Sequence, residues 1–146
     1  LGVIEDCLQE AVDYARQRSQ HGKPIARHQL VQDHIAHIEV SRQATQSLLF
    51  DAVKAKMVND EDPVDREARQ RADLLAAEAK FFASNAACDA ADRAVQVLGG
   101  RGYSELYRPG RHWKDVRVCR IYEGTDEILK LKIAAGILGQ GYEAFS

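Results

Sequence analysis

One carboxylate in this sequence stands where it could act as a base. Glu123 lies between Tyr122 and Gly124 in the segment RIYEGTDEI (120–128). Thr125 is a good N-cap and two acidic residues follow it, so a helix is expected to begin there. A helix N-terminus attracts acidic residues for electrostatic reasons alone. From these residues alone, an ordinary helix-start acid is the more economical interpretation of Glu123, and a proton-abstracting carboxylate is the alternative.

Histidines could serve as metal ligands. His34 and His37 lie three residues apart, with Asp33 and Glu39 nearby. Di-iron bundles use Glu-x-x-His pairs on two helices, and this sequence contains no Glu-x-x-His. We therefore expect no metal site and interpret these side chains as solvated polar residues on a helix.

A basic and glycine-containing segment follows residue 95. Its basic residues are Arg101, Arg108, Arg111, Lys114, Arg117 and Arg120, with acidic residues among them. Those interruptions and the formal net charge of −2 argue against a nucleic-acid partner and favour internal ion pairs or one anionic cofactor. The stretch QVLGGRGY (96–103) looks like a phosphate-binding loop but does not follow a strand. A helix C-cap is the simpler interpretation, and a ligand contact remains the alternative.

Long helices are expected to position these groups. Only three prolines interrupt stretches rich in helix-favouring residues, and no stretch shows strand-like alternation. The expected helices run over about 1–19, 28–58, 64–98 and from 125 onward, with an irregular segment over 101–120. Expected inward positions include Ile4, Ala11, Ile38, Leu49, Ala52, Ala79, Phe82, Ala90, Leu131 and Leu138. Short turns between such helices predict an all-α fold, an up-down-up-down four-helix bundle.

Composition narrows the class of protein further. The 146 residues, 45% hydrophobic and 29% charged, fit one soluble domain. No apolar run is long enough to span a bilayer. Cys7, Cys88 and Cys119 lack metal-ligand spacing and indicate reduced thiols in an intracellular compartment. Because the chain begins at Leu1, we expect a fragment or a processed chain.

Four segments, taken in order, resemble the C-terminal helical domain of the acyl-CoA dehydrogenases. They are YARQRSQHGKPIARHQ (14–29), AVQVLGGRGY (94–103), KDVR (114–117) and IYEGTDEI (121–128). Each segment is weakly specific, but the ordered set spans nearly the whole chain and is highly specific. The resemblance implies that residues 1–146 are the C-terminal four-helix bundle of a flavoprotein oxidoreductase of fatty acid metabolism. The N-terminal helical and middle β domains of that family would lie outside this chain.

The resemblance also implies roles for particular residues. Glu123 matches the catalytic base, and Tyr122 and Gly124 match substrate-binding positions beside it. Positions that match contacts to flavin adenine dinucleotide (FAD), some to the FAD of a neighbouring subunit, are Arg18, Gln20, His28, Gln29, Gln96, Val97, Leu98, Gly99, Gly100, Thr125, Asp126 and Glu127. Two positions depart from the family pattern: His21 replaces an aromatic residue before glycine, and Lys114 replaces an arginine before aspartate. Lysine keeps the charge but loses the bidentate fork of arginine.

The implied activity is FAD-dependent α,β-dehydrogenation of an acyl-CoA thioester. The implied partners are an acyl-CoA substrate, an acceptor resembling electron-transfer flavoprotein, and further copies of the chain in a dimer of dimers. The location would be cytoplasmic in a bacterium or the mitochondrial matrix in a eukaryote. Two alternatives remain open: a catalytically silent assembly module of a hetero-oligomeric relative, and an acyl-CoA oxidase domain. The fragment alone is expected to be inactive and to bind FAD poorly.

Overall fold

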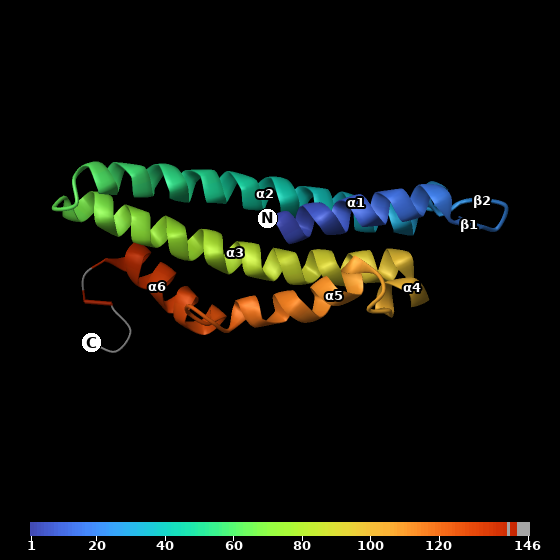
Figure 1. Ribbon diagram of the computed structural model, residues 1–146. Coiled ribbons are helices and arrows are strands. Elements are labelled where there is room, and N and C mark those ends of the chain that lie inside the picture. Colours follow the sequence, from blue (N-terminus) through green and yellow to red (C-terminus); the bar gives the residue numbers. More distant parts are fainter. Residues whose placement is uncertain (140, 143–146) are drawn as a thin grey trace.

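The computed structural model describes residues 1–139, 141 and 142, and within them four columns of helix run alternately in opposite directions (Figure 1). The first three columns are single helices: α1 (Gly2–Gln17), α2 (Gln29–Glu61) and α3 (Arg66–Leu98). The fourth column consists of α5 (Arg108–Asp115), the 3₁₀ helix η2 (Val116–Arg120) and α6 (Asp126–Leu138). The predicted all-α, up-down-up-down architecture is confirmed.

Short elements connect the columns at one end of the bundle. Strands β1 (Ser19–Gln20) and β2 (Lys23–Pro24) pair antiparallel, and η1 (Ile25–Arg27) leads into α2. The expectation of no strand missed this two-residue pair. His21 and Gly22 both have positive φ, 51° and 76°, which is the conformation that a tight two-residue hairpin turn requires.

The prediction of an irregular segment over residues 101–120 was wrong. That stretch contains most of α4 (Gly100–Tyr103), all of α5 and all of η2. Pro109 lies in the first turn of α5, where its fixed φ suits a helix and its missing N–H costs nothing. Polar bonds across the bundle then hold α5 in place: Asp6 of α1 lies 2.9 Å from Nη1 of Arg108 and 2.6 Å from Nε2 of His112.

The core lies where α1 packs against the C-terminal half of α3. Ile4, Cys7, Ala11 and Ala15 of α1 are fully buried, as are Ala90, Ala91 and Ala94 of α3. Alanine on both helices allows their backbones to approach closely. The predicted inward positions Ile4, Ala11, Ile38, Ala52, Ala79 and Ala90 are confirmed as buried. Burial also raises the pKa of the Cys7 thiol to about 12, so this thiol is not reactive.

Other predicted inward positions are exposed instead. The exposed fractions are 43% for Leu49, 36% for Phe82, 42% for Leu131 and 60% for Leu138, so these predictions were wrong for the single chain. For Leu49, on α2, the reason is the length of α1. With 16 residues, α1 can flank only about half of the 33-residue α2, and the rest of α2 is left without that cover.

Candidate active site

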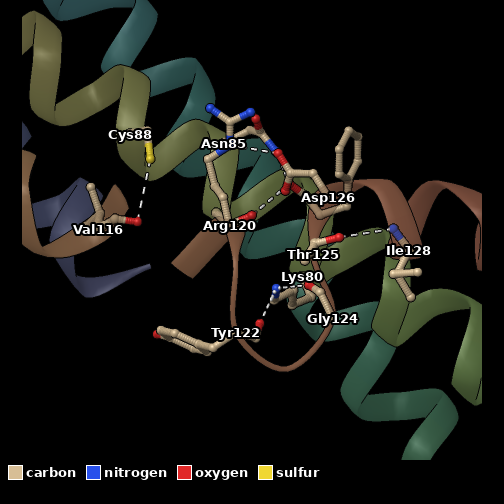
Figure 2. A network of polar contacts seen from close by, with 12 residues as sticks. Lys80, Asn85, Cys88, Val116, Arg120, Tyr122, Gly124, Thr125, Asp126 and Ile128 are labelled. Carbon is tan, nitrogen blue, oxygen red and sulfur yellow. Dashed lines mark hydrogen bonds and ion pairs between the residues drawn. The ribbon is translucent and has the colours of Figure 1, made fainter. Parts of the chain in front are cut away.

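The loop between η2 and α6 carries Glu123 and is built around a capped helix start (Figure 2). The side chain of Thr125 accepts a hydrogen bond from the backbone N–H of Ile128 at 3.4 Å, as an N-cap residue does. Glu123 and Gly124 both have positive φ, 53° and 104°. This conformation is ordinary for glycine but uncommon for glutamate, so the loop reverses direction at some cost in backbone energy.

The Glu123 side chain lies at the protein surface. It is exposed, and within residues 1–139, 141 and 142 its carboxylate makes no hydrogen bond. The carbonyl groups of the residues before and after it are anchored from α3. Nζ of Lys80 donates to the carbonyl oxygen of Tyr122 at 2.9 Å and to that of Gly124 at 2.6 Å (Figure 2). The carboxylate is therefore accessible while its backbone is held.

Asp126, the first residue of α6, is the buried acid of this site, with 4% exposure. Its Oδ2 accepts hydrogen bonds from Nε of Arg120 at 2.7 Å and from Nδ2 of Asn85 at 3.2 Å. Burial alone would raise the pKa of Asp126, but the Arg120 and Asn85 hydrogen bonds and the Arg120 charge outweigh burial and leave that pKa below its usual value. Oδ1 is buried with no partner among the described residues.

A small pocket opens beside Asp126. Its volume is about 110 Å³, and its lining residues are Arg117, Arg120, Ile121, Thr125, Asp126 and Glu127. Two arginines and two acids line this space at the N-terminal end of α6, so it suits a hydroxyl-bearing group that can both donate and accept hydrogen bonds. All three predicted cofactor-contacting residues at the start of α6 are among its lining residues.

The remaining predicted cofactor residues lie at another place, the end of the bundle where β1 and β2 are located. Arg18 follows α1, Gln20 lies in β1, and His28 caps α2 with its Nε2 at 3.4 Å from the carbonyl oxygen of Gln20. Gln29 begins α2 and is exposed. The segment 96–100 ends α3 at the same end of the molecule.

A second pocket, of about 400 Å³, lies at this end. Its lining residues are Tyr14, Gln17, Arg18, Ser19 and Arg101, and the Arg101 guanidinium carbon lies 5.9 Å from the centre of the Tyr14 ring. Two arginines in one hollow suit an anion such as a phosphate. Val97 and Leu98 are buried in the core, with 6% and 3% exposure, so only their backbone could face a ligand.

The structure thus gathers the predicted site residues into two groups, not one. Lys80 and Leu98 mark the two groups on α3, and 18 residues of helix between them correspond to about 27 Å. The first group holds Glu123 and the start of α6. The second holds Arg18 and the glycines that follow α3.

Sequence reasoning missed several residues of these groups. Lys80 and Asn85 gave no signal, because each resembles any polar residue on a long helix. Arg101 was visible only as one member of the basic segment, and Tyr14 only as part of a matching motif. In the part of the chain that the structure describes, no group of three or more His, Cys, Asp or Glu residues is arranged to hold a metal ion. None of the helices described is long and apolar enough to cross a membrane.

Comparison with known proteins identifies the family. The family described as "Acyl-CoA dehydrogenase, C-terminal domain" matches residues 1–138. The 3-(aryl)acrylate reductase of Clostridium sporogenes is 37% identical over 138 residues, which cover 94% of this chain and 34% of that protein. Subunit CarC of the caffeyl-CoA reductase–Etf complex of Acetobacterium woodii is 33% identical, with 94% of this chain and 34% of that protein covered.

A solved structure agrees. Butyryl-CoA dehydrogenase of Megasphaera elsdenii matches with a TM-score of 0.82 and 33% identity, over 94% of this chain and 33% of that one. The chain therefore spans about a third of the length of these relatives. Because both the sequence and the helical arrangement match over residues 1–138, the chain belongs to the acyl-CoA dehydrogenase family, in which it corresponds to the C-terminal helical domain.

Proposed function

We propose that this chain is the catalytic-base domain of a FAD-dependent enzyme that introduces a double bond between the α and β carbons of an acyl-CoA thioester. Glu123 would take the proton from the α carbon. FAD, when bound, supplies the acceptor for the hydride that leaves the β carbon. The observation that carries the proposal is the placement of Glu123, an exposed carboxylate on a backbone that is anchored on both sides.

The backbone around Glu123 supports a second role in substrate binding. Within the described residues, the N–H groups of Glu123 and Gly124 donate no hydrogen bond to another backbone group. Such donors can bind a thioester carbonyl, and they would stabilise the negative charge that develops on it as the α proton leaves. Tyr122, 46% exposed, precedes them and would contact the substrate. Glycine suits position 124 because its φ is 104° and because a Cβ there would lie 3.3 Å from Cδ2 of Leu129.

The residues present fit FAD at both groups. Arg18 and Arg101 share one pocket, and their charges suit the diphosphate of the cofactor. The unpartnered, buried Oδ1 of Asp126 would accept a hydrogen bond from a cofactor hydroxyl, which would satisfy an atom that is costly to leave unpaired. Since the two groups lie about 27 Å apart along α3, we propose that they serve two FAD molecules, one of them a neighbouring subunit's. The enzyme would then be a homo-oligomer, a dimer of dimers.

The names of the relatives bear on the direction of the reaction. Two of them are named reductases, and CarC is named as part of a complex with Etf. A reductase would run the same chemistry in reverse, with Glu123 returning a proton to the α carbon. We propose that this enzyme too exchanges electrons with an electron-transfer flavoprotein, and that the measured direction of turnover distinguishes dehydrogenase from reductase.

The test is Glu123→Gln in the complete enzyme that contains this domain. Glutamine keeps the size of the side chain but cannot take a proton, so turnover should fall by about 10²–10⁴-fold while bound FAD is retained. The matched control is Glu67→Gln, which removes an acid from the first turn of α3 and should leave turnover unchanged. Turnover of Glu123→Gln close to that of the unaltered enzyme would refute the role of Glu123, whichever acyl-CoA is used.

A further inference from the structure

We infer that Lys80 is a positioning residue that places Glu123 for the substrate by holding the carbonyl groups of the residues before and after it. The inference rests on the proposed function of Glu123 and adds to it a residue from a distant part of the chain. Lys80 lies on α3, and the two carbonyl groups that it binds lie 42 and 44 residues further along the sequence.

Lys80 bonds to the backbone on either side of Glu123. A lysine ammonium has three donors, and Lys80 directs two of them to the carbonyls of residues 122 and 124, leaving the peptide of residue 123 between them. Its Nζ also lies 5.9 Å from the centre of the Tyr122 ring, which further favours the cation at this place. In Figure 2 the Lys80 side chain reaches from α3 to the inside of the loop.

Glu123 needs such support because its backbone conformation is unfavourable. A non-glycine residue with φ near 53° is strained, and strained residues persist only where their surroundings fix them. Hydrogen bonds from a charged donor are stronger than those from a neutral one, so Lys80 is well suited to fix this turn. The carboxylate has no hydrogen bond of its own within the described residues, so the contacts that fix the position of Glu123 are those to the backbone around it.

Lys80 does not act as the ion-pair partner of Glu123. Among the ion pairs within residues 1–139, 141 and 142, none joins the two side chains. Its donors are used by backbone carbonyls, so the ammonium orients the base without occupying the carboxylate oxygens. Asn85, further along the same helix, binds Asp126 and fixes the start of α6 in the same way. The Glu123 turn and the start of α6 are thus both held by side chains of α3.

The decisive experiment compares Lys80→Met alone and combined with Glu123→Gln, in the complete FAD-loaded enzyme. Methionine keeps a long side chain but removes both donors. With Lys80→Met alone we expect kcat to fall about 10–100-fold and KM to change little, because misplacing a catalytic group by about 1 Å can cost about 10²-fold. In the Glu123→Gln background, Lys80→Met should change kcat less than about twofold, because Lys80 acts through Glu123.

Three further variants complete the design. Lys80→Arg retains charged donors and should recover most of the lost kcat. Lys130→Met is the matched control, since Lys130 lies 5.8 Å from the centre of the Phe81 ring and, within the described residues, makes no hydrogen bond or ion pair with the loop. If Lys80→Met does not fold with FAD, Lys80→Gln, which keeps a polar but neutral amide, replaces it with the same expected loss.

The outcomes separate the two proposals. A folded Lys80→Met or Lys80→Gln enzyme with kcat within twofold of the unaltered enzyme overturns the positioning role, even if Glu123→Gln is inactive. If the two losses in kcat simply multiply in the double variant, the positioning role is overturned as well. Lys80 would then act independently of Glu123. Near-normal turnover of Glu123→Gln alone would instead overturn the proposed function.

Discussion

At the scale of single residues, the site contrasts two acids that lie three residues apart. Glu123 is exposed and has no hydrogen-bond partner among the described residues, whereas Asp126 is buried and bound by Arg120 and Asn85. A buried carboxylate in such a network fixes the groups around it, because losing one partner leaves the others unsatisfied. An accessible carboxylate on a fixed backbone suits chemistry. Composition and spacing give both residues as acids near the same helix start, and only the family resemblance assigns them different roles.

The depressed pKa of Asp126 makes a prediction about stability and pH. A carboxyl group whose pKa is lower in the folded chain than in the unfolded chain stabilises the fold above its unfolded pKa, and that contribution is lost as pH falls through the folded pKa. Asp126→Asn should therefore lower the free energy of unfolding by about 1–2 kcal/mol at pH 7. The difference between the two chains should shrink as pH falls through the lowered pKa of Asp126, where the wild-type carboxyl becomes protonated.

Urea unfolding at pH 7 and pH 3 measures both quantities. The comparison variant is Glu39→Gln. The Arg42 hydrogen bond lowers the pKa of Glu39 to about 2, but that side chain is 41% exposed and its ion pair is screened by water, so the loss should be smaller than for Asp126→Asn. An equal loss for Asp126→Asn at both pH values would contradict the assignment.

At the scale of elements, α4 and α5 pack backbone to backbone. A Cβ built on Gly102 would lie 2.5 Å from the carbonyl oxygen of Val95 on α3, and one on Gly110 would lie 2.6 Å from that of Gly102. These two glycines therefore let α4 lie directly on α3 and α5 directly on α4. This contact fixes the place of Arg101, and through α5 it fixes the start of η2, which leads to the Glu123 loop.

Gly102→Ala should accordingly destabilise the chain by about 1–3 kcal/mol, because rigid backbone atoms would have to move to admit the methyl group. Gly100→Ala, in the same short helix, should change stability by less than about 0.5 kcal/mol, since nothing lies within 4 Å of its added Cβ. Thermal or urea unfolding of the two variants measures the contrast. Similar stabilities for both would show that α4 moves away from α3 at little cost.

At the scale of the whole molecule, much apolar surface faces outward. Phe50, Val53 and Met57 of α2 are 55%, 47% and 60% exposed, and Leu138 of α6 is 60% exposed. Monomeric soluble proteins rarely expose large contiguous apolar surface, so such residues mark contacts with further protein. On our proposal, the cover is a second copy of this domain.

We therefore predict that the 146-residue chain self-associates in dilute buffer, as measured by sedimentation velocity. Replacing Phe50, Val53 and Met57 together by lysine should shift the chain to the monomer, because charges at such positions oppose burial. Circular dichroism is the control and should show unchanged helix content. An unaltered chain that sediments as a monomer at tens of micromolar would contradict this prediction.

Much of the fold could be predicted from the sequence, because long breaker-free stretches and short turns permit few arrangements. Capping residues also explain the ends of α3. Asp65 caps its start by accepting from the backbone N–H groups of Glu67 and Ala68, and Gly99 with φ 60° ends it. The exposure of Leu49 and Leu131 could not be predicted from the sequence, since these residues follow the same periodicity as core residues. Periodicity reports which face is apolar but not what covers it.

Less of the candidate site than of the fold could be predicted from the sequence. The motif gives Glu123, Gly124 and Thr125, and the role of Glu123 stays a prediction. Lys80 could not be found, because it acts on backbone carbonyls, which carry no residue identity. A lysine that binds side chains of opposite charge leaves a pattern in sequence, whereas one that binds peptide groups leaves none.

Helix α3 carries the anchors of both site groups, and this has a consequence for how the chain can vary. An α-helix turns about 100° and advances about 1.5 Å with each residue. One residue inserted between Asn85 and Gln96 would therefore rotate the glycine end of α3 by more than a quarter turn against the end that holds the Glu123 loop. Substitutions within this stretch do not change the rotation between its two ends. An insertion or a deletion does. On our proposal, this stretch of α3 would set how far apart, and at what angle, the active centres of adjacent copies stand.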